Sequence, residues 1–251
     1  MAPAQKVLFV HAHPDDESLW TGGTIAALTA RGVQTSLITC TWVEGTSRHW
    51  ELLAAASELG MTEEPIMLGY ADAFVPESAP GAPRFLDVPF DDTVQRVVEH
   101  IRALKPDAVV TYNAYGIYGH PDHIHAHRLA AIAADAAAIG SYAPERGAPW
   151  RTKSLYFATL PTGTVDTLRP HLGEDSRIRI AGTAPDLVDV TLDLQDRLGD
   201  KVRAIRSHST EMARSESMQQ FAAMPRDMQR LFLASESYRR RDLVPGGCEL
   251  R

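Results

Sequence analysis

Two short stretches of the chain concentrate histidine and carboxylate side chains. The first is HAHPDDE at 11–17, and the second is YGHPDH at 118–123, about one hundred residues later. Crowded charges are costly to hold together unless a counter-charge offsets their repulsion. Imidazole nitrogen and carboxylate oxygen are ligands that Zn²⁺ and Fe²⁺ both accept. The two stretches therefore predict a metal site to which both contribute.

The number of candidate ligands suits a catalytic site. A catalytic zinc usually takes three protein ligands and keeps one position for water. Two histidines and one carboxylate would supply those ligands, and an adjacent carboxylate that does not bind the metal could accept a proton from the water. Pro14 and Pro121 each fix one φ angle and help to hold the turn around them.

Several of these residues also have an ordinary interpretation. Asp15, Asp16 and Glu17 could simply favour the start of the helix that follows. His11 lies nearer to the strand and could be a hydrogen-bonded core histidine. We expect His125 and His127 to belong to the surface and packing of a helix.

The pattern of the remaining chain predicts alternating strands and helices. Short β-branched and aromatic runs predict strands at 6–12, 33–41, 65–71, 107–113 and 154–161. Apolar side chains at helical spacing predict helices at 17–32, 47–60, 91–106, 120–140 and 196–212. Prolines predict a loop at 76–90, and the mixed stretch 160–195 is expected to be strand-rich. This order predicts an α/β fold with a mostly parallel sheet and helices on both faces.

Such a sheet would bring the two motifs together. Ligands of open parallel sheets bind at the carboxyl ends of strands, near a switch in strand order, and each motif follows a predicted strand. We therefore expect the metal site at the carboxyl ends of the strands. The 251 residues predict a single domain over 1–251, with a core at 5–160 and a less defined C-terminal part at 160–251.

Composition narrows the classes of partner. A formal net charge of -7 and a pI near 5.8 argue against a nucleic-acid or anionic-membrane partner. The chain has no apolar run of the roughly 18 residues that a membrane span needs, and no signal region precedes the first strand. Cys40 and Cys248 form neither a zinc motif nor a disulfide framework. We expect a cytoplasmic protein, and the sequence leaves a homo-oligomer open.

The two motifs are also similar to those of a known family. AHPDDE at 12–17 and HPDH at 120–123 resemble the paired motifs of the PIG-L/LmbE-like zinc-dependent deacetylases, and the resemblance extends from about residue 5 to residue 135. It implies a Rossmann-like fold. It also implies hydrolysis of N-acetylglucosaminyl lipids or inositols, or of the amide of mycothiol conjugates.

The resemblance assigns roles to individual residues. It implies that His13, Asp16 and His123 are the metal ligands and that Asp15 is the general base acting on the water at the metal. His120 is implied to stabilise the oxyanion, with either His120 or Asp15 protonating the leaving amine. Asp122 is implied to orient and charge His120, because a carboxylate beside an imidazole raises its pKa and fixes its tautomer.

Other matches concern the substrate. Tyr118 resembles a mobile tyrosine of the mycothiol-pathway deacetylases that contacts the substrate carbonyl. Arg48 and Asp72 fall where the family has sugar-contacting groups. HSTEM at 208–212 resembles the family's H-x-[ST]-Q segment, but Glu211 stands where glutamine is usual. This departure makes His208 a weak candidate for the site.

We therefore predict a metal-dependent hydrolase that removes an N-acetyl group from an N-acetylglucosaminyl-type or other amino-sugar substrate. Zn²⁺ is the expected cofactor, and Fe²⁺ stays open. An amidase of a mycothiol-type conjugate and a natural-product tailoring deacetylase are alternatives with the same metal ligands. A non-catalytic metal- or nucleotide-binding α/β protein is an alternative of another class. TGGT at 21–24 is its only glycine signal, and it lacks both the G-x-G-x-x-G spacing and a P-loop lysine.

Overall fold

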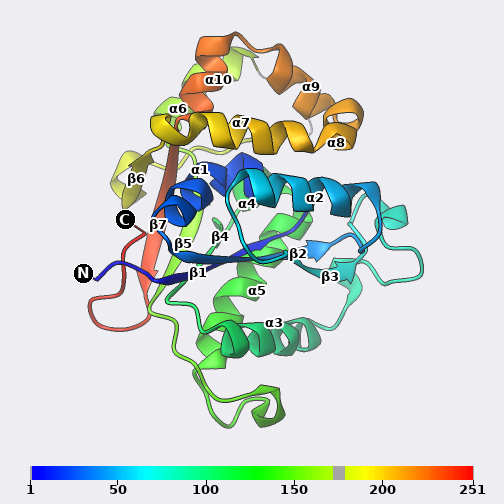
Figure 1. The fold of residues 1–251 in the computed structure, drawn as a ribbon, viewed down its shortest axis with the longest axis vertical. Helices are drawn as coiled ribbons and strands as arrows, with labels where there is room; N and C mark the ends of the chain where they lie inside the picture. The colour runs from blue at the N-terminus through cyan, green and yellow to red at the C-terminus, as the bar shows by residue number, and fades with distance from the viewer. Residues whose placement is uncertain (1, 172–178, 251) are drawn as a thin grey trace.

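Within residues 2–171 and 179–250, which the computed structural model describes, seven strands form one sheet ordered β3-β2-β1-β4-β5-β7-β6 (Figure 1). The strands are β1 (Lys6–His11), β2 (Gln34–Thr41), β3 (Ile66–Tyr70), β4 (Ala108–Tyr112), β5 (Ser154–Thr159), β6 (Val190–Asp193) and β7 (Ser235–Asp242). Strands β1 to β5 pair in parallel, whereas β7 runs antiparallel to both of its neighbours. The predicted α/β fold with a mostly parallel sheet is confirmed.

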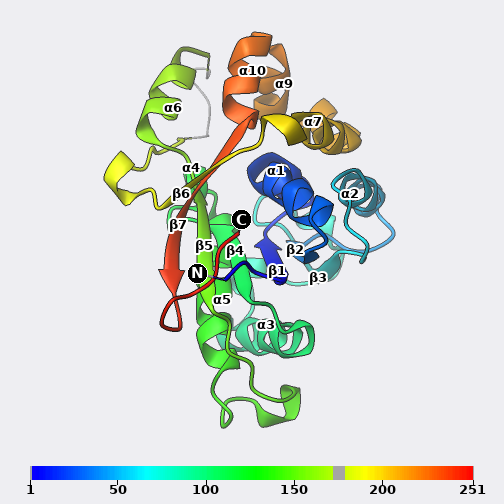
Figure 2. The ribbon, with the colours of Figure 1, turned by 60° about the vertical axis from the view of Figure 1, so that its left-hand side comes forward.

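Helices cover both faces of this sheet (Figures 1 and 2). Helices α1 and α2 lie on one face and α3 and α5 on the other; α7 to α10 lie beyond α1 and α2, and α6 lies beside α10. The helices are α1 (Asp16–Ala30), α2 (Ser47–Glu58), α3 (Phe90–Leu104), α4 (Gly116–Gly119), α5 (Pro121–Ala137), α6 (Thr162–Leu168), α7 (Leu198–Ser207), α8 (Ser209–Arg214), α9 (Glu216–Ala223) and α10 (Arg226–Leu233). The core helices α3 and α5 pack against each other, and α7 packs on α1 and α2.

The first 160 residues follow the predicted order of elements. Each of the five predicted strands and each of the four predicted helices in this part is present, with ends a few residues from the expected bounds. The loop predicted at 76–90 contains two single-turn 3₁₀ helices, at Pro76–Ser78 and Phe85–Asp87, and no strand. The β1, β2 and β4 strands are buried almost throughout, as parallel strands covered on both faces must be.

The C-terminal part differs from the expectation. The described residues of 160–195 hold helix α6 and one short strand, β6, so the strand-rich prediction is wrong there; residues 172–178 lie outside the described part. The helix predicted at 196–212 is divided into α7 and α8 at His208, whose ψ of 55° interrupts the helix. Strand β7 was not predicted, because its sequence SESYRRRD is largely polar and charged.

The order of the strands explains why the two motifs meet. From β1 the chain moves to β2 and β3 on one side, and it then returns to place β4 on the other side of β1. This reversal leaves a crevice between the carboxyl ends of β1 and β4, where open α/β sheets bind their ligands. HAHPDDE leaves β1 and YGHPDH follows β4, so neighbouring strands deliver both motifs.

The TGGT segment serves packing. It lies inside α1, where a Cβ at Gly23 would come within 2.7 Å of Leu194 and a Cβ at Gly22 would lie 3.3 Å from the Lys201 side chain. The two glycines therefore let α1 pack closely against Leu194 and against α7, and they form no phosphate-binding loop.

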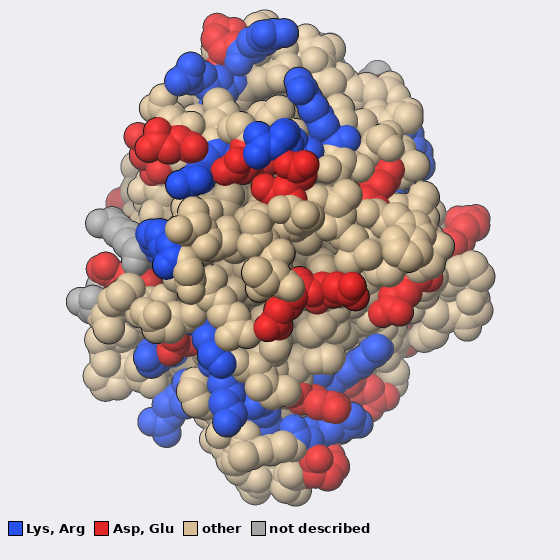
Figure 3. All heavy atoms as spheres, in the orientation of Figure 1, with Lys and Arg blue, Asp and Glu red and all other residues tan. Residues whose placement is uncertain are grey.

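The surface carries both signs of charge. On the face drawn in Figure 3, Lys and Arg side chains are interspersed with Asp and Glu. Among the helices of residues 2–171 and 179–250, none has the length and apolar content required to cross a bilayer.

Candidate active site

A cavity of about 470 Å³ opens at the carboxyl ends of the strands. Segments that follow β1, β2, β3 and β4 line one end of it, and helices of the C-terminal part line the other. Of the residues predicted from the motifs, the following line the cavity: His13, Asp15, Asp16, Arg48, Asp72, Tyr118 and His120. Asp122 and His123 are fully buried directly behind them.

Three of the predicted metal ligands converge. His13 Nδ1 lies 3.1 Å from His123 Nε2, and the Asp16 carboxylate lies 3.3 Å from each of these nitrogens. Ligand atoms about 2 Å from a common tetrahedral centre are about 3.3 Å apart, which is the spacing found here. The donor set and its spacing therefore fit Zn²⁺ or Fe²⁺.

The neighbours of both histidines fix their tautomers. His13 Nε2 lies 3.1 Å from Asp122 Oδ2 and 3.2 Å from Asp72 Oδ2, and His123 Nδ1 lies 3.2 Å from the Gly116 carbonyl. Carboxylate and carbonyl oxygens only accept, so His13 Nε2 and His123 Nδ1 carry the hydrogens. His13 Nδ1 and His123 Nε2 then face each other beside the Asp16 carboxylate, an arrangement that a cation between them would satisfy. Metal-binding histidines in proteins are held in this way.

Asp16 is positioned by residues that the sequence analysis did not select. Its Oδ2 accepts hydrogen bonds from the His13 amide at 2.8 Å and from the Tyr112 hydroxyl at 2.6 Å, and its Oδ1 accepts from Trp20 Nε1 at 3.0 Å. The Tyr112 ring also stacks on the His123 ring, with centroids 4.2 Å apart. Tyr112 is the last residue of β4, and Trp20 lies one helical turn after Asp16 in α1. The position at a strand end and the helical spacing are therefore the sequence features from which these two residues could have been predicted.

Asp122 lies against a different histidine from the one expected. The family resemblance implies that its carboxylate pairs with His120, but Oδ2 contacts His13 and accepts from the Ala73 amide at 2.9 Å. Its contact with the His120 ring runs through the backbone, because the Asp122 N–H donates to His120 Nδ1 at 3.2 Å. The cause is the start of α5: His120 is the N-cap, so its ring is occupied by the first turn of the helix.

The loop before α5 presents Tyr118 and His120 to the cavity. Tyr118 Oη lies 3.4 Å from His123 Nε2. Because His120 Nδ1 accepts a hydrogen bond, the neutral ring carries its hydrogen on Nε2. Burial, followed by the charge of His13, lowers the pKa of His120 to about 4. Ile117 has a φ of 67°, which is strained for a β-branched residue and marks this loop as constrained by its surroundings.

Asp15 sits at the cavity in an unusual backbone conformation. Its φ is 126°, and its N–H donates to Glu17 Oε2 at 2.9 Å. Arg48 Nη2 lies 3.3 Å from Asp15 Oδ2. Burial raises the pKa of Asp15 to about 7, with Arg48 opposing the shift and the charges of Asp16 and Glu211 adding to it. This carboxyl is thus held beside the predicted metal ligands without being one of them.

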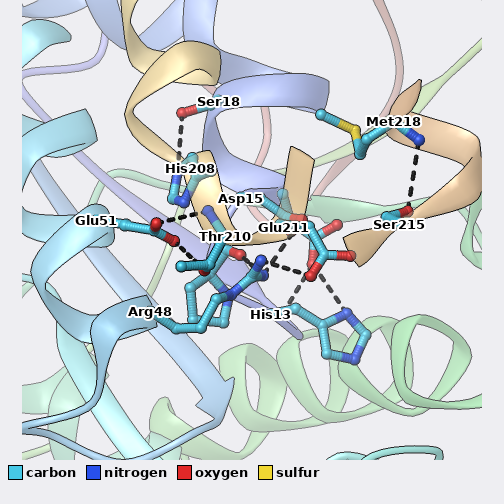
Figure 4. A network of polar contacts seen from close by, with 12 residues as sticks. His13, Asp15, Ser18, Arg48, Glu51, His208, Thr210, Glu211, Ser215 and Met218 are labelled. Carbon is cyan, nitrogen blue, oxygen red and sulfur yellow. Dashed lines mark hydrogen bonds and ion pairs between the residues drawn. The ribbon is translucent and has the colours of Figure 1, made fainter. Parts of the chain in front are cut away.

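Arg48 reaches from α2 toward Asp15 and Glu211 (Figure 4). Its Nη1 lies 2.7 Å from Glu211 Oε2, its Nη2 also donates to the Pro14 carbonyl, and its guanidinium lies 5.1 Å from the centroid of the Trp42 ring. Arg48 is only 3% exposed. Asp72 is similarly engaged, because Oδ1 accepts from the amide of Phe74 at 2.7 Å while Oδ2 contacts His13. Both residues predicted to contact a sugar therefore already have protein partners.

The remaining candidates lie outside the cavity. Glu17 is fully buried and pairs with His208 at 2.7 Å, so it does more than favour the start of α1. His11 is a core histidine, with Nε2 2.9 Å from Thr21 Oγ1. On α5, His125 packs against Phe85 and Phe90, and His127 lies 2.8 Å from the Tyr112 carbonyl, as expected for packing residues.

The donor atoms form two overlapping groups. In each, one ligand atom per residue lies within 4.8 Å of the others: His13, His120 and His123, and separately His13, Asp72, His120 and Asp122. In the second group, Asp72 and Asp122 lie next to Nε2 of His13. The first group contains His13 and His123, two of the predicted ligands, whose Nδ1 and Nε2 lie beside the Asp16 carboxylate, so it agrees better with the predicted ligand set.

The chain is similar to several known proteins of one family. The family described as GlcNAc-PI de-N-acetylase (PIG-L) matches residues 8–134, which include both motifs. A 1D-myo-inositol 2-acetamido-2-deoxy-alpha-D-glucopyranoside deacetylase of Rhodococcus erythropolis is 33% identical over 88% of this chain and 86% of its own. The deacetylase of the same description from Streptomyces scabiei is 32% identical over 96% of this chain and 85% of its own. The N,N'-diacetylchitobiose deacetylase from Pyrococcus horikoshii has the same fold, with a TM-score of 0.69 and 17% identity over 95% of this chain and 84% of that chain. The chain belongs to the PIG-L family of deacetylases.

Proposed function

We propose that this protein hydrolyses the N-acetyl amide of an N-acetylglucosaminyl-type substrate. The observation that carries the proposal is the close approach of His13 Nδ1 and His123 Nε2, 3.1 Å apart, with the Asp16 carboxylate 3.3 Å from both. Asp15 lies next to this cluster, and because it is not one of the proposed ligands its carboxylate is available for proton transfer. The two relatives at 32% and 33% identity are described as deacetylases of an inositol-linked acetamido-sugar, which supports this reaction class.

The proposed cofactor is Zn²⁺, with Fe²⁺ as the alternative that the same donors accept. His13 Nδ1, His123 Nε2 and the Asp16 carboxylate would hold it. When bound, such an ion polarises the amide carbonyl and lowers the pKa of water toward about 7. The surrounding carboxylates of Asp15, Asp72 and Asp122 favour a dication at this place.

Asp15 is proposed as the general base. Its carboxylate lines the cavity beside the ligand cluster, so it can accept the proton of the attacking water. The contact with Arg48 holds the carboxylate in place, and the Asp15 N–H is fixed by Glu17. Arg48 is thus proposed to act through Asp15, and Asp72 through His13, in place of the sugar contacts expected from the motifs.

His120 and Tyr118 are proposed to stabilise the carbonyl oxygen as it gains charge. The neutral His120 ring offers an Nε2–H, and Tyr118 offers a hydroxyl whose pKa burial raises well above its ordinary value, so that it stays a donor. An amine leaves only after protonation. His120 and Asp15 are the two groups in the cavity that we propose for returning that proton.

The test is release of primary amine from N-acetylglucosamine and from its inositol glycoside, by protein purified metal-free and then supplied with Zn²⁺ or Fe²⁺. We expect turnover with one of these ions and little without. A protein that binds neither ion at micromolar concentration, or releases no amine from any acetamido-sugar when loaded, would contradict the proposal.

A further inference from the structure

The two ends of the cavity differ in chemistry. One end is the polar cluster around His13 and Asp15, where the proposed reaction takes place. The other end is formed by α1, α6, α9 and α10, whose side chains there are mostly apolar. We call this surface the apolar wall, and it consists of Trp20, Leu168, Met218, Phe221, Met224 and Phe232.

The apolar wall is continuous with the reactive end. The ring of Trp20 lies 6.1 Å from that of Tyr118 and 5.9 Å from that of Phe232, measured between centroids, and Phe232 lies 5.5 Å from Phe221. Trp20 also donates to Asp16, one of the proposed ligands. One substrate molecule could therefore place its amide at the proposed metal ligands and another of its groups along the apolar wall.

Polar groups on this side of the cavity are few and mostly engaged. Arg214 donates to Glu211 at 2.5 Å, and Ser215 Oγ accepts from the Met218 amide at 3.4 Å (Figure 4). Gln220 is the polar side chain that α9 contributes to the described lining. A ring covered with hydroxyl groups would lose its hydration against this wall and find few partners, which costs binding free energy.

We propose that the substrate of this protein carries an apolar group that binds along the apolar wall. The inference rests on the proposed function, and it narrows the substrate class from acetamido-sugars in general to those bearing a hydrocarbon or aromatic portion. That portion comes from one of two sources, an acyl chain longer than acetyl or an apolar aglycone. An apolar group on the substrate would cover the apolar surface of the wall. Binding is then favourable because this surface is removed from water.

The experiment compares two substrate series on the metal-loaded parent protein. One lengthens the acyl group of N-acylglucosamine from acetyl through butanoyl to octanoyl. The other changes the aglycone of the N-acetylglucosaminide from methyl to phenyl and octyl, with the inositol glycoside as the hydroxyl-rich comparison. A buried CH₂ raises binding about threefold to fourfold, so we expect kcat/KM to rise at least about tenfold along one series. The series that responds identifies the source of the apolar group.

A matched pair of variants tests whether the wall is responsible. Phe221→Ala and Phe232→Ala should each lower the ratio of kcat/KM between the apolar and the acetyl or methyl substrate, by about threefold to tenfold. Leu231→Ala is the control, because Leu231 is 43% exposed on the same helix as Phe232 and does not line the cavity. An unchanged ratio in both wall variants would place the apolar group elsewhere and overturn the proposal.

The outcomes separate this inference from the proposed function. If neither series rises, the apolar wall does not select the substrate, although the hydrolase function stands. If no compound in either series releases an amine with either metal, the proposed function itself fails. The substrate series uses only the parent protein, so the inference remains testable even if a wall variant does not fold.

Discussion

The carboxylate of Asp122 lies 3.1 Å from Nε2 of His13, although the two residues come from motifs that follow different strands. The same carboxylate accepts from the Ala73 amide, so it joins the segments after β1, β3 and β4 in one contact. It holds the His13 ring with Nδ1 turned toward His123 and Asp16. A carboxylate in this position sets the tautomer of a metal ligand and raises its basicity.

Replacing Asp122 should therefore weaken metal binding. Asp122→Asn keeps the shape but removes the charge that faces His13, and we expect metal affinity to fall about 10-fold to 100-fold, with turnover falling in parallel at limiting metal. Competition with a chromogenic chelator measures the affinity. Asp135→Asn is the control, because Asp135 is an exposed aspartate on the same helix, paired with Arg241. Equal metal affinity in the parent and in Asp122→Asn would show that this carboxylate does not support the metal site.

Substitutions of Asp15 and His13 should have different effects on metal content and on turnover. Asp15→Asn should keep the metal content of the parent and lower kcat about 100-fold to 10,000-fold, because the group that accepts the proton is gone. Asparagine has nearly the size and shape of aspartate, so the packing around this position should be retained. His13→Ala should lose bound metal and turnover together. Elemental analysis of the purified variants, beside their rates, tells the two roles apart, and near-parent turnover of Asp15→Asn would rule out the base assignment.

The ion pair between Arg48 and Glu211 should contribute to stability. The two side chains are 3% and 10% exposed, so removing Glu211 leaves a buried guanidinium with fewer partners. We expect Glu211→Ala to lower the free energy of unfolding by about 3 kcal/mol, and Glu211→Gln, which keeps a hydrogen-bond acceptor, by less.

Urea unfolding of the metal-free proteins measures both changes. Asp87→Ala provides the comparison, because its pair with Arg84 is about half exposed and screened by water, and little change is expected there. If Glu211→Ala unfolds at the same urea concentration as the parent, the pair is not stabilising.

The buried pair of His208 and Glu17 should make stability depend on pH. Burial lowers the pKa of His208, but the charge and hydrogen bond of Glu17 outweigh it, and Asp15 adds to them while Arg48 opposes, so the pKa is raised above 6.5. The folded state therefore binds more protons than the unfolded state between 6.5 and the folded pKa. The stabilisation is fully present below pH 6.5 and is lost as pH rises through the folded pKa.

The measurement is the difference in unfolding free energy between the parent and His208→Gln at a series of pH values, with EDTA present so that metal binding does not contribute. We expect the difference to be largest near pH 6 and to shrink as pH rises. A difference that stays constant with pH would mean that His208 is neutral in the folded protein.

The sequence by itself determined the features that depend on local sequence patterns. Buried apolar runs and helical spacing predicted the elements up to residue 160, and the density of histidine and carboxylate in HAHPDDE and HPDH predicted a shared metal site. These features depend on residues near one another in the chain. The polar strand β7 and the helices α9 and α10 could not be predicted in the same way, because their positions depend on packing against elements far away in sequence.

Only the tertiary structure decided which side chains of the two motifs contact each other. HPDH places Asp122 next to both His120 and His123, yet the carboxylate turns to His13, because His120 caps α5 and β1 lies beside β4. Arg48 and Asp72 likewise contact Asp15 and His13 of the first motif, and the apolar wall is assembled from four separate helices. A contact between distant residues depends on strand order and helix packing, and neither is encoded in the spacing of a motif.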